Sequence, residues 1–580
     1  MIKLNKNLEN MPRFLIFLIF IIHNIYFILK IGNYWDEKHH IETGGSALNS
    51  IKEFLTGEYS KETSSLFNPE YYGSVFLLPQ HIITKYFVEK KYLFSFLQRN
   101  EYIFNEIDYY FFIRHLIVTL FVAFTFILIS LMLDSLFSKK STNLFLIFTL
   151  FFPRFLGHTT FNSLDIPFAT FMFLAFVFFF FEVNRKKGFT NFSNISLTIQ
   201  GLLFSLLICV RGNAFVFIFI LFIYTLFFEV RYQNLNNFIN KSIKLFISTV
   251  IFSYVFSPKG WRDPISYLEG VYSVQFNVNW IGSTLTNGDF IFGQNTTSNY
   301  LIIWLFFTIP IIYFLYFYLF IRHNDKKLIF SLENFSLFFI FIVLVLHIIF
   351  TPISYNGIRH YLFLVPFFGL ICSFGFDRIQ NYKVKTFMFL LTLSYIILTQ
   401  SQFDQYKYSY FNEFVSTEEL SIYCTQNING CGLWGTDYYA ISGKEFSFIV
   451  DKHEDDINNL FVCYPTESLT PYLTNTDKFS YPFLWTIKSD APTQNETDGF
   501  EQFKIVYSEG HFREFILNQD INVFYTYSIH NPQKKQNTCN FHLFQNEKKI
   551  ICEYVDSVAR NIRNRKVHFS YLSKCLMKNI

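Results

Sequence analysis

The sequence predicts an α-helical membrane protein with about eleven spans, followed by an α+β domain outside the membrane. The first reason is composition: 51% of the 580 residues are hydrophobic, 21% are aromatic and only 16% are charged, whereas soluble proteins average about 25% charged residues. The second reason is that long apolar stretches recur through the first 400 residues and then stop. This composition excludes disordered, coiled-coil and fibrous proteins. A net charge of +4 is too small to suggest a nucleic acid as partner.

Each predicted span is a mostly apolar stretch, because a helix needs about 20 such residues to cross a membrane. The stretches are 14–31, 113–134, 143–157, 166–183, 195–210, 213–229, 245–257, 300–320, 329–351, 361–376 and 386–400. The stretch 143–157 is the weakest, because its apolar run ends at Pro153 and Arg154. The odd number of spans depends on this stretch.

The loops between the spans predict the orientation, because Lys and Arg accumulate on the cytoplasmic side. With the N-terminus inside, the inner segments carry seventeen Lys and Arg residues, and the short outer segments carry five. We therefore expect an integral membrane protein with a cytoplasmic N-terminus and an extracytoplasmic C-terminal domain. The membrane is either a bacterial inner membrane or that of the endoplasmic reticulum.

The chain divides into a membrane module, 1–400, and a soluble domain, 401–580. The first apolar stretch is expected to be an uncleaved anchor, because no small-residue cleavage site follows it. The loop 34–112 then lies outside the membrane. Its mixture of acidic and apolar residues favours helices that lie in the membrane interface.

The C-terminal domain contains short aromatic and β-branched runs between polar turns. The runs 446–450 and 523–527 are predicted to be strands. This domain holds six of the eight cysteines, namely Cys424, Cys431, Cys463, Cys539, Cys552 and Cys575. Their even number favours disulfides in an oxidising compartment, with zinc as the alternative, and six cysteines allow fifteen pairings.

Two adjacent carboxylates, Asp36 and Glu37, follow the first span directly. Such a pair can supply a general base, with one carboxylate activating a hydroxyl and the other orienting it or binding a metal. A divalent metal is therefore a possible cofactor. The alternative is a solvated acidic start to the outer loop.

The segment 153–167, between the third and fourth spans, concentrates polar residues beside lipid, where each polar group needs a partner. Its candidate site residues are His158, Asn162 and Asp165. The alternative is a capped turn, in which Asp165 caps the next helix and Pro167 lies in its first turn.

The segment 355–360 places Arg359 and His360 just outside the tenth span. A guanidinium at the membrane interface suits a phosphate, because its planar group makes two charge-assisted hydrogen bonds. The alternative is an arginine that reaches to lipid headgroups. Arg211 and Arg262 are weaker candidates of the same kind.

Taken in order, these stretches resemble the GT-C superfamily of integral-membrane glycosyltransferases. The resemblance is to family 39 relatives, which include protein O-mannosyltransferases and lipid A aminoarabinose transferases. It covers about residues 1–450. The matching pieces are 35–37, 114–115, 153–167, 356–360, 408–413 and 435–445. Leu164 departs from the family pattern, which has a basic residue before Asp165.

The resemblance implies an enzyme that takes a sugar from a polyprenyl-phosphate donor to an acceptor hydroxyl at the outer membrane face, with inversion. Asp36 would be the base that takes the hydroxyl proton, and Glu37 would assist it. Arg359, and Arg211 beside it, would hold the leaving phosphate. His158 and Asp165 would shape the acceptor side. The lipid-linked donor and membrane lipids are the expected partners, and the acceptor stays open.

Two other functions are consistent with the same pattern. A carrier or flippase for a lipid-linked glycan would also present charges at the outer face, but it would require functional charges in the middle of spans. His347 is the clearest polar residue of that kind. A non-catalytic scaffold that recruits partners through its tail would not require Asp36.

Overall fold

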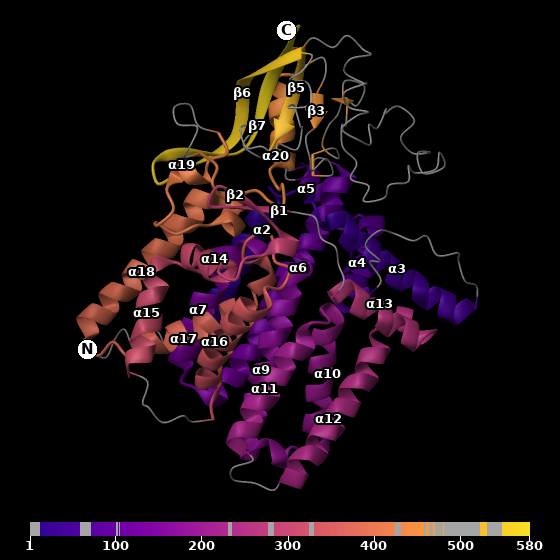
Figure 1. Cartoon of the computed structure of the whole chain (residues 1–580), viewed down its shortest axis with the longest axis vertical. Coiled ribbons are helices and arrows are strands. Elements are labelled where there is room, and N and C mark those ends of the chain that lie inside the picture. Colours follow the sequence, from indigo (N-terminus) through magenta and orange to yellow (C-terminus); the bar gives the residue numbers. More distant parts are fainter. Residues whose placement is uncertain are drawn as a thin grey trace.

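The computed structural model describes residues 12–57, 71–99, 103, 105–229, 235–276, 283–323, 330–423, 431–457, 460–462, 468–469, 472, 479–480, 523–529 and 548–579. Most of the first 400 residues are helical, and the strands gather in the last third of the chain. Figure 1 shows this sheet at one end of the molecule, with α11 and α12 meeting at the opposite end.

The helices of the membrane module match the predicted spans closely. They are α2 (Arg13–Ile28), α6 (Glu106–Leu136), α7 (Lys139–Leu150), α8 (Pro153–His158), α9 (Asp165–Lys186), α10 (Asn194–Val210), α11 (Ala214–Glu229), α12 (Leu235–Val255), α14 (Tyr300–Thr308), α15 (Ile311–His323), α16 (Leu332–Phe350), α17 (Leu364–Asp377) and α18 (Tyr382–Phe403). Among the described residues, five helices are long and apolar enough to cross a membrane, and the bent pair α14 and α15 makes a sixth. Shorter apolar helices are α2, α10, α11 and α17. The predicted helical membrane architecture is confirmed, whereas the sidedness of the termini stays a prediction.

Two of the predicted spans are broken, each at a proline. The stretch 300–320 forms α14 and α15, which meet at 108° around Pro310. The stretch 143–157 divides into α7 and α8, and Pro153 is the first residue of α8. Proline lacks the backbone N–H that continues a helix, which explains both breaks.

The outer loop 34–112 forms helices in its described parts. They are α3 (Glu37–Thr56), α4 (Ser74–Lys90) and α5 (Phe94–Arg99). Helix α3 packs closely on α4: a Cβ at Gly44 would lie 2.6 Å from the carbonyl oxygen of Leu77. Glycine at this position therefore allows the two backbones to approach. Figure 1 shows α3, α4 and α13 (Pro264–Phe276) side by side, projecting from the bundle. Their position in a membrane interface stays a prediction.

The C-terminal domain combines short helices with a mixed sheet, so the predicted α+β class is confirmed. Its helical elements are η6 (Asp404–Ser409), α19 (Thr417–Leu420) and α20 (Gly443–Lys452). Its strands are β3 (Leu460–Val462), β4 (Phe479–Ser480), β5 (Val523–Ser528), β6 (Lys548–Ile562) and β7 (Arg565–Asn579), in the order β4-β3-β5-β7-β6. A separate hairpin, β1 (Ser283–Thr286) and β2 (Asp289–Phe292), lies in the membrane module's sequence.

One of the two strand predictions is right and the other is wrong. The run 523–527 lies in β5, but the run 446–450 lies inside α20. In that helix Phe446 and Val450 are buried and Phe448 is 48% exposed. Residues four apart share one face of a helix, so this run fits a helix as well as a strand.

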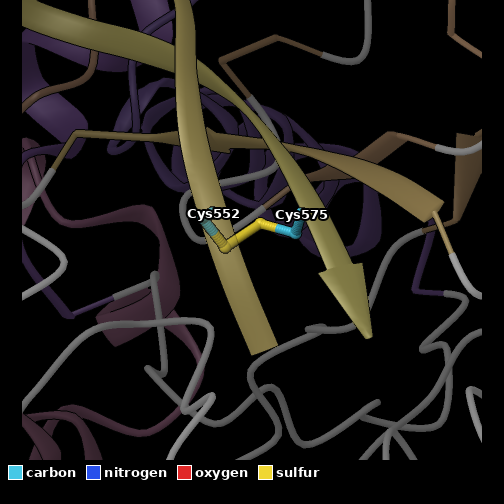
Figure 2. The surroundings of a disulfide bond; sticks show 2 residues. All are labelled: Cys552 and Cys575. Atoms are coloured by element: carbon cyan, nitrogen blue, oxygen red, sulfur yellow. A yellow bond between two sulfur atoms is a disulfide. The ribbon is translucent and has the colours of Figure 1, made fainter. Parts of the chain in front are cut away.

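The disulfide prediction is confirmed where the structure describes the cysteines. Cys552 on β6 is bonded to Cys575 on β7 (Figure 2), and Cys431 is also disulfide-bonded. Cys209 and Cys372 are free and buried in the membrane module. Cys424, Cys463 and Cys539 lie outside the described residues.

Buried ion pairs fasten the C-terminal domain to the membrane module. Lys444, at the start of α20, is bonded to Asp108 on α6 at 2.6 and 2.8 Å and to the carbonyl oxygen of Leu29 at 2.9 Å. Lys30, which follows the end of α2, pairs with Asp404 at 3.0 Å. Within the domain, Arg560 on β6 joins Asp404 at 3.0 Å and Glu445 at 2.7 Å. The bonds of Lys444 and Lys30 therefore join the C-terminal domain to α6 and to the end of α2.

Candidate functional site

Asp36 lies at the start of α3, directly after the end of the first membrane helix. Its Oδ2 accepts a hydrogen bond from Nη1 of Arg359 at 2.9 Å, and its side chain is 23% exposed. The predicted base is therefore held by the predicted phosphate ligand and is still accessible to a second molecule.

Glu37, the next residue, has a different environment. Its side chain is completely buried, pairs with Nε of Arg114 and lies 3.3 Å from Nε2 of His115. Burial raises the pKa of this carboxyl, but Arg114 and His115 reverse the effect and lower it to about 2. Glu37 is thus ionised and engaged, which favours a role in fixing the start of α3.

Arg359 lies in the short turn η5 (Arg359–Tyr361) and joins two carboxylates. Besides Asp36, its Nε lies 3.6 Å from Oδ2 of Asp165. The guanidinium also lies over the ring of Tyr355 at 4.8 Å and over the ring of Tyr439 at 5.1 Å. These contacts hold the group flat between aromatic faces.

The turn before Arg359 requires glycine. Gly357 has φ of 72°, and a Cβ there would lie 2.9 Å from Nη1 of Arg154 and 3.0 Å from the ring of Trp304. The backbone N–H of Gly357 donates to the hydroxyl of Tyr300 at 3.0 Å. Arg154 and Trp304 therefore fix the turn that aims Arg359.

A second arginine completes the charged cluster. Arg211, the C-cap of α10, pairs with Oδ1 of Asp165, and its side chain is 18% exposed. Asp36, Asp165, Arg211 and Arg359 thus form one group of two carboxylates and two guanidiniums, which we call the outer cluster. Its parts come from four separate segments of the sequence.

Three buried nitrogens in this region have no hydrogen-bond partner among the described residues. They are Nε of Arg211, Nε of Arg359 and Nε2 of His360. Burial, together with Arg211 and Arg359, lowers the pKa of His360 well below its usual value, so its imidazole is neutral. The two guanidinium nitrogens can donate hydrogen bonds, and buried donors normally have acceptors. The neutral ring of His360 donates to the backbone of Ile353 through its other nitrogen, so its Nε2 is an acceptor. An oxyanion beside the two guanidinium nitrogens would supply acceptors.

His158 and Asn162 form a layer beneath the outer cluster. The amide nitrogen of Asn162 lies 2.9 Å from Oδ2 of Asp165 and 3.0 Å from Nδ1 of His158. Nε2 of His158 lies 3.1 Å from the hydroxyl of Tyr438. Burial, opposed by Asp165, lowers the pKa of His158 to about 3, so the ring is neutral. Both residues are buried. Asn162 is bonded to Asp165, and His158 is bonded to Asn162.

The capped-turn alternative for 153–167 needs a correction. Asp165 does not cap α9 with its side chain; Oδ1 of Asn162 accepts hydrogen bonds from the backbone N–H groups of Leu164 and Asp165, at 3.2 and 2.9 Å. Asn162 therefore accepts the hydrogen bonds at the start of α9. The carboxylate of Asp165 is free of this role and pairs with Arg211 and Arg359.

The C-terminal domain contributes Tyr439 to the site. Its hydroxyl lies 3.0 Å from the amide nitrogen of Asn162 and 3.3 Å from Oδ2 of Asp165. Its carbonyl oxygen accepts from the backbone N–H of Trp35 at 3.1 Å. Tyr439 therefore links the outer cluster with the turn that carries Asp36.

Asp437 holds the loop that presents Tyr439. This carboxylate is buried and accepts hydrogen bonds from the hydroxyl of Tyr408 and from the backbone N–H groups of Ile441 and Ser442. Burial raises its pKa to about 7, and the hydrogen bonds only partly oppose this. The loop thus closes around a carboxyl that titrates near neutrality.

The structure thus brings four of the predicted charged residues together, and it adds tyrosines that were not predicted. Tyr439 lies in a stretch that carried the family resemblance and Tyr355 directly precedes another, but nothing in their spacing indicated contact with Arg359. Tyr72, whose hydroxyl lies 2.5 Å from Nε2 of His39, faces the same group and interacts electrostatically with Arg211, Asp36 and Arg359. In the described part of the chain, no three or more His, Cys, Asp or Glu residues form a group suited to a metal ion.

Comparison with known proteins finds no matching family model and no matching curated protein. Among solved structures, the chain is similar to the crystal structure of ArnT from Cupriavidus metallidurans bound to undecaprenyl phosphate. The two chains share 10% identity and a TM-score of 0.46, over 96% of this chain and 97% of ArnT.

Proposed function

We propose that the protein is a GT-C-type glycosyltransferase, which moves a sugar from a polyprenyl-phosphate donor to an acceptor hydroxyl at the outer face of the membrane. The observation that carries this proposal is the arrangement around Arg359. An accessible carboxylate, Asp36, shares one guanidinium with a buried carboxylate, Asp165, beside a second arginine and three unsatisfied nitrogens. The proposed base, Asp36, thus directly contacts Arg359, the proposed ligand of the phosphate.

The outer cluster has the composition that the reaction needs. The leaving group is a phosphate, which requires cations and hydrogen-bond donors more than it requires an acid. Arg211 and Arg359 supply both the charge and the donors, including an unpaired Nε on each side chain. Without substrate, the negative charges of the two carboxylates neutralise the positive charges of the two arginines, which stabilises the cluster.

The proposed reaction is a displacement at the anomeric carbon of the donor sugar. The acceptor oxygen forms a bond to the anomeric carbon from the face opposite the phosphate, and the bond between that carbon and the phosphate oxygen breaks. The phosphate leaves with the electron pair, and the hydroxyl proton passes to Asp36. Negative charge therefore appears at the phosphate as the charge on Asp36 is neutralised. Arg359, which touches Asp36, can follow that charge with a small movement.

We infer different roles for the other predicted residues. Glu37 has no exposed side-chain surface and is bonded to Arg114, so it positions the segment that carries Asp36. His158 and Asn162 are buried beneath Asp165 and position it. Because no group of metal-binding residues exists among the described residues, we route no step through a divalent metal.

The sidedness and the partners belong to the same proposal. Disulfides in the C-terminal domain agree with an oxidising compartment, which supports an extracytoplasmic position for that domain. The resemblance to family 39 sequences supports a lipid-linked donor. A carrier function is less favoured, since His347 is bonded to the hydroxyl of Tyr361 at 2.7 Å and so serves as a packed, satisfied residue.

The decisive variant is Asp36→Asn, which keeps the shape of the side chain and removes the base. We expect sugar transfer from a synthetic polyprenyl-phosphate donor to fall by about 10²–10⁴-fold, with normal abundance and unfolding temperature. The matched control is Asp455→Asn, an exposed aspartate of the C-terminal domain, which should be fully active. Full activity of Asp36→Asn would reject the mechanism, and donor translocation without transfer would favour a carrier.

A further inference from the structure

A cavity lies at the end of the helix bundle opposite the outer cluster. Four membrane helices end or begin there. Its wall includes Leu136 at the end of α6, Val183 near the end of α9, Phe228 near the end of α11 and Leu332 at the start of α16. Its volume is about 410 Å³, which is within the usual range for binding sites of small molecules. It lies near the end of the bundle that the sequence places on the cytoplasmic side.

One part of the wall of this cavity is aromatic. Phe180 and Phe330 have ring centroids 5.4 Å apart, and Phe228 lies 5.7 Å from Phe330. Tyr224 stacks on Phe330 from behind at 5.5 Å. These contacts make a firm apolar surface, which suits the glycerol and upper acyl region of a lipid.

Two ionisable residues line the same cavity. Glu333 lies in the first turn of α16, and its Oε2 is buried without a hydrogen-bond partner among the described residues. Lys187, which follows the end of α9, is exposed at the rim. The neighbouring Arg185 is already paired with Glu182 at 2.7 Å, and Arg378 acts on Glu333 only through its electrostatic field.

The unsatisfied oxygen of Glu333 is the informative feature. The carboxyl is hydrogen-bonded by Ser331 and by its own backbone N–H, yet its buried Oε2 has no partner among the described residues, and such an oxygen is costly. A primary ammonium would donate to this oxygen and lie beside the aromatic rings, which also attract cations. A quaternary ammonium has no N–H and cannot donate.

We propose that this cavity binds a phospholipid whose headgroup carries a primary ammonium. The ammonium lies on Glu333, the phosphate lies toward Lys187, and the glycerol region packs on Phe180, Phe228 and Phe330. This site takes a lipid from the leaflet opposite the outer cluster. It is independent of the proposed transfer reaction and does not require it.

The test is native mass spectrometry of the full-length protein, delipidated and then exposed to phosphatidylethanolamine, phosphatidylcholine or phosphatidylglycerol with identical acyl chains. We expect phosphatidylethanolamine to bind about tenfold more tightly than phosphatidylcholine, because one hydrogen bond to a charged group is lost. In Glu333→Gln this preference should fall to nearly one. Equal binding of the three lipids, or tightest binding of phosphatidylglycerol, would overturn the proposal.

Two further variants make the result interpretable. Glu89→Gln removes an exposed carboxylate on α4, in the outer part of the molecule, and should leave the lipid preference unchanged. Phe228→Trp fills the cavity but keeps Glu333, and it should weaken the binding of phosphatidylethanolamine. If the headgroup preference is unchanged in Glu333→Gln and phosphatidylethanolamine binds as tightly to Phe228→Trp as to the unchanged protein, with normal unfolding temperatures, the lipid binds elsewhere.

Discussion

The membrane module contains two groups of opposite charges that differ in one respect. At the predicted cytoplasmic end, Arg13 makes two bonds of 2.5 Å to Asp134, and Asp377 binds Lys140 at 2.6 Å and Lys385 at 3.1 Å. None of these side chains has a buried nitrogen or oxygen without a partner. In the outer cluster, by contrast, both arginines keep such a nitrogen.

This difference separates charges that hold the protein together from charges that await a ligand. Charges that pair completely need no further explanation, because buried polar groups are normally satisfied. Charges that pair incompletely, beside an accessible carboxylate, indicate a binding site. Arg114 also keeps two unpaired nitrogens, but its carboxylate partner Glu37 is completely buried. Asp36 with Arg359 combines an unpaired nitrogen with an accessible carboxylate, although Asp36 and Glu37 are neighbours in the sequence.

The strongest test of this distinction is Glu37→Gln. Removing one partner of a buried ion pair leaves Arg114 uncompensated, which costs about 3–5 kcal/mol. We expect a marked fall in unfolding temperature and in membrane abundance, measured by thermal unfolding in detergent. Asp36→Asn is the matched control, since its side chain is partly exposed and it should unfold normally. A Glu37→Gln protein that unfolds normally would contradict the distinction, because the pair with Arg114 would then contribute little to stability.

The next effect concerns the arginine of the outer cluster. Arg359→Lys keeps the charge but loses the planar group that joins Asp36 and Asp165. We expect kcat to fall by about a hundredfold, with a rise in the KM for the donor and little change in stability. Arg13→Lys at the opposite end should do the reverse, lowering the unfolding temperature without changing kcat. Similar effects of the two variants on kcat would remove the distinction between the clusters.

The helices could be predicted from the sequence for physical reasons, and the charged residues singled out there lie together in the outer cluster. Apolar length defines a span and basic loops orient it, so ten of the predicted stretches coincide with a helix or a bent pair. The exception, 143–157, breaks at Pro153 because its polar continuation folds inward as α8. The run 446–450 was wrong because its pattern fits both a strand and a helix.

The partners of the charged residues could not be predicted in the same way. Asp36, Asp165, Arg211 and Arg359 are far apart in the sequence, and only the packing of the helices decides which carboxylate receives which arginine. The composition of 34–40 gives no sign that Glu37 turns inward to Arg114 while Asp36 stays accessible. Likewise, Tyr439 reaches the site because contacts such as that of Lys444 with Asp108 join the C-terminal domain to the bundle.

Tyr439→Phe tests whether this docking matters for the reaction. The variant keeps the ring under Arg359 and removes the hydroxyl that contacts Asn162 and Asp165. We expect a fall in kcat of about tenfold, corresponding to one hydrogen bond in a charged site. Tyr423→Phe, in the C-terminal domain and stacked on Tyr554, is the control and should be unaffected. An unchanged rate in Tyr439→Phe would limit the C-terminal domain to a structural role.

A further effect is a dependence of stability on pH through Asp437. Because burial raises its pKa from 3.8 to about 7, the folded protein keeps a proton that the unfolded chain releases. Stability should therefore fall as the pH rises from about 4 to 7, by at most about 1.4 kcal/mol per pH unit. Buried histidines such as His40, with a pKa lowered to about 4, contribute the opposite slope, so the comparison must be made with Asp437→Asn. The difference between the two unfolding curves should decrease with pH in this window, and a constant difference would mean that Asp437 is ionised throughout.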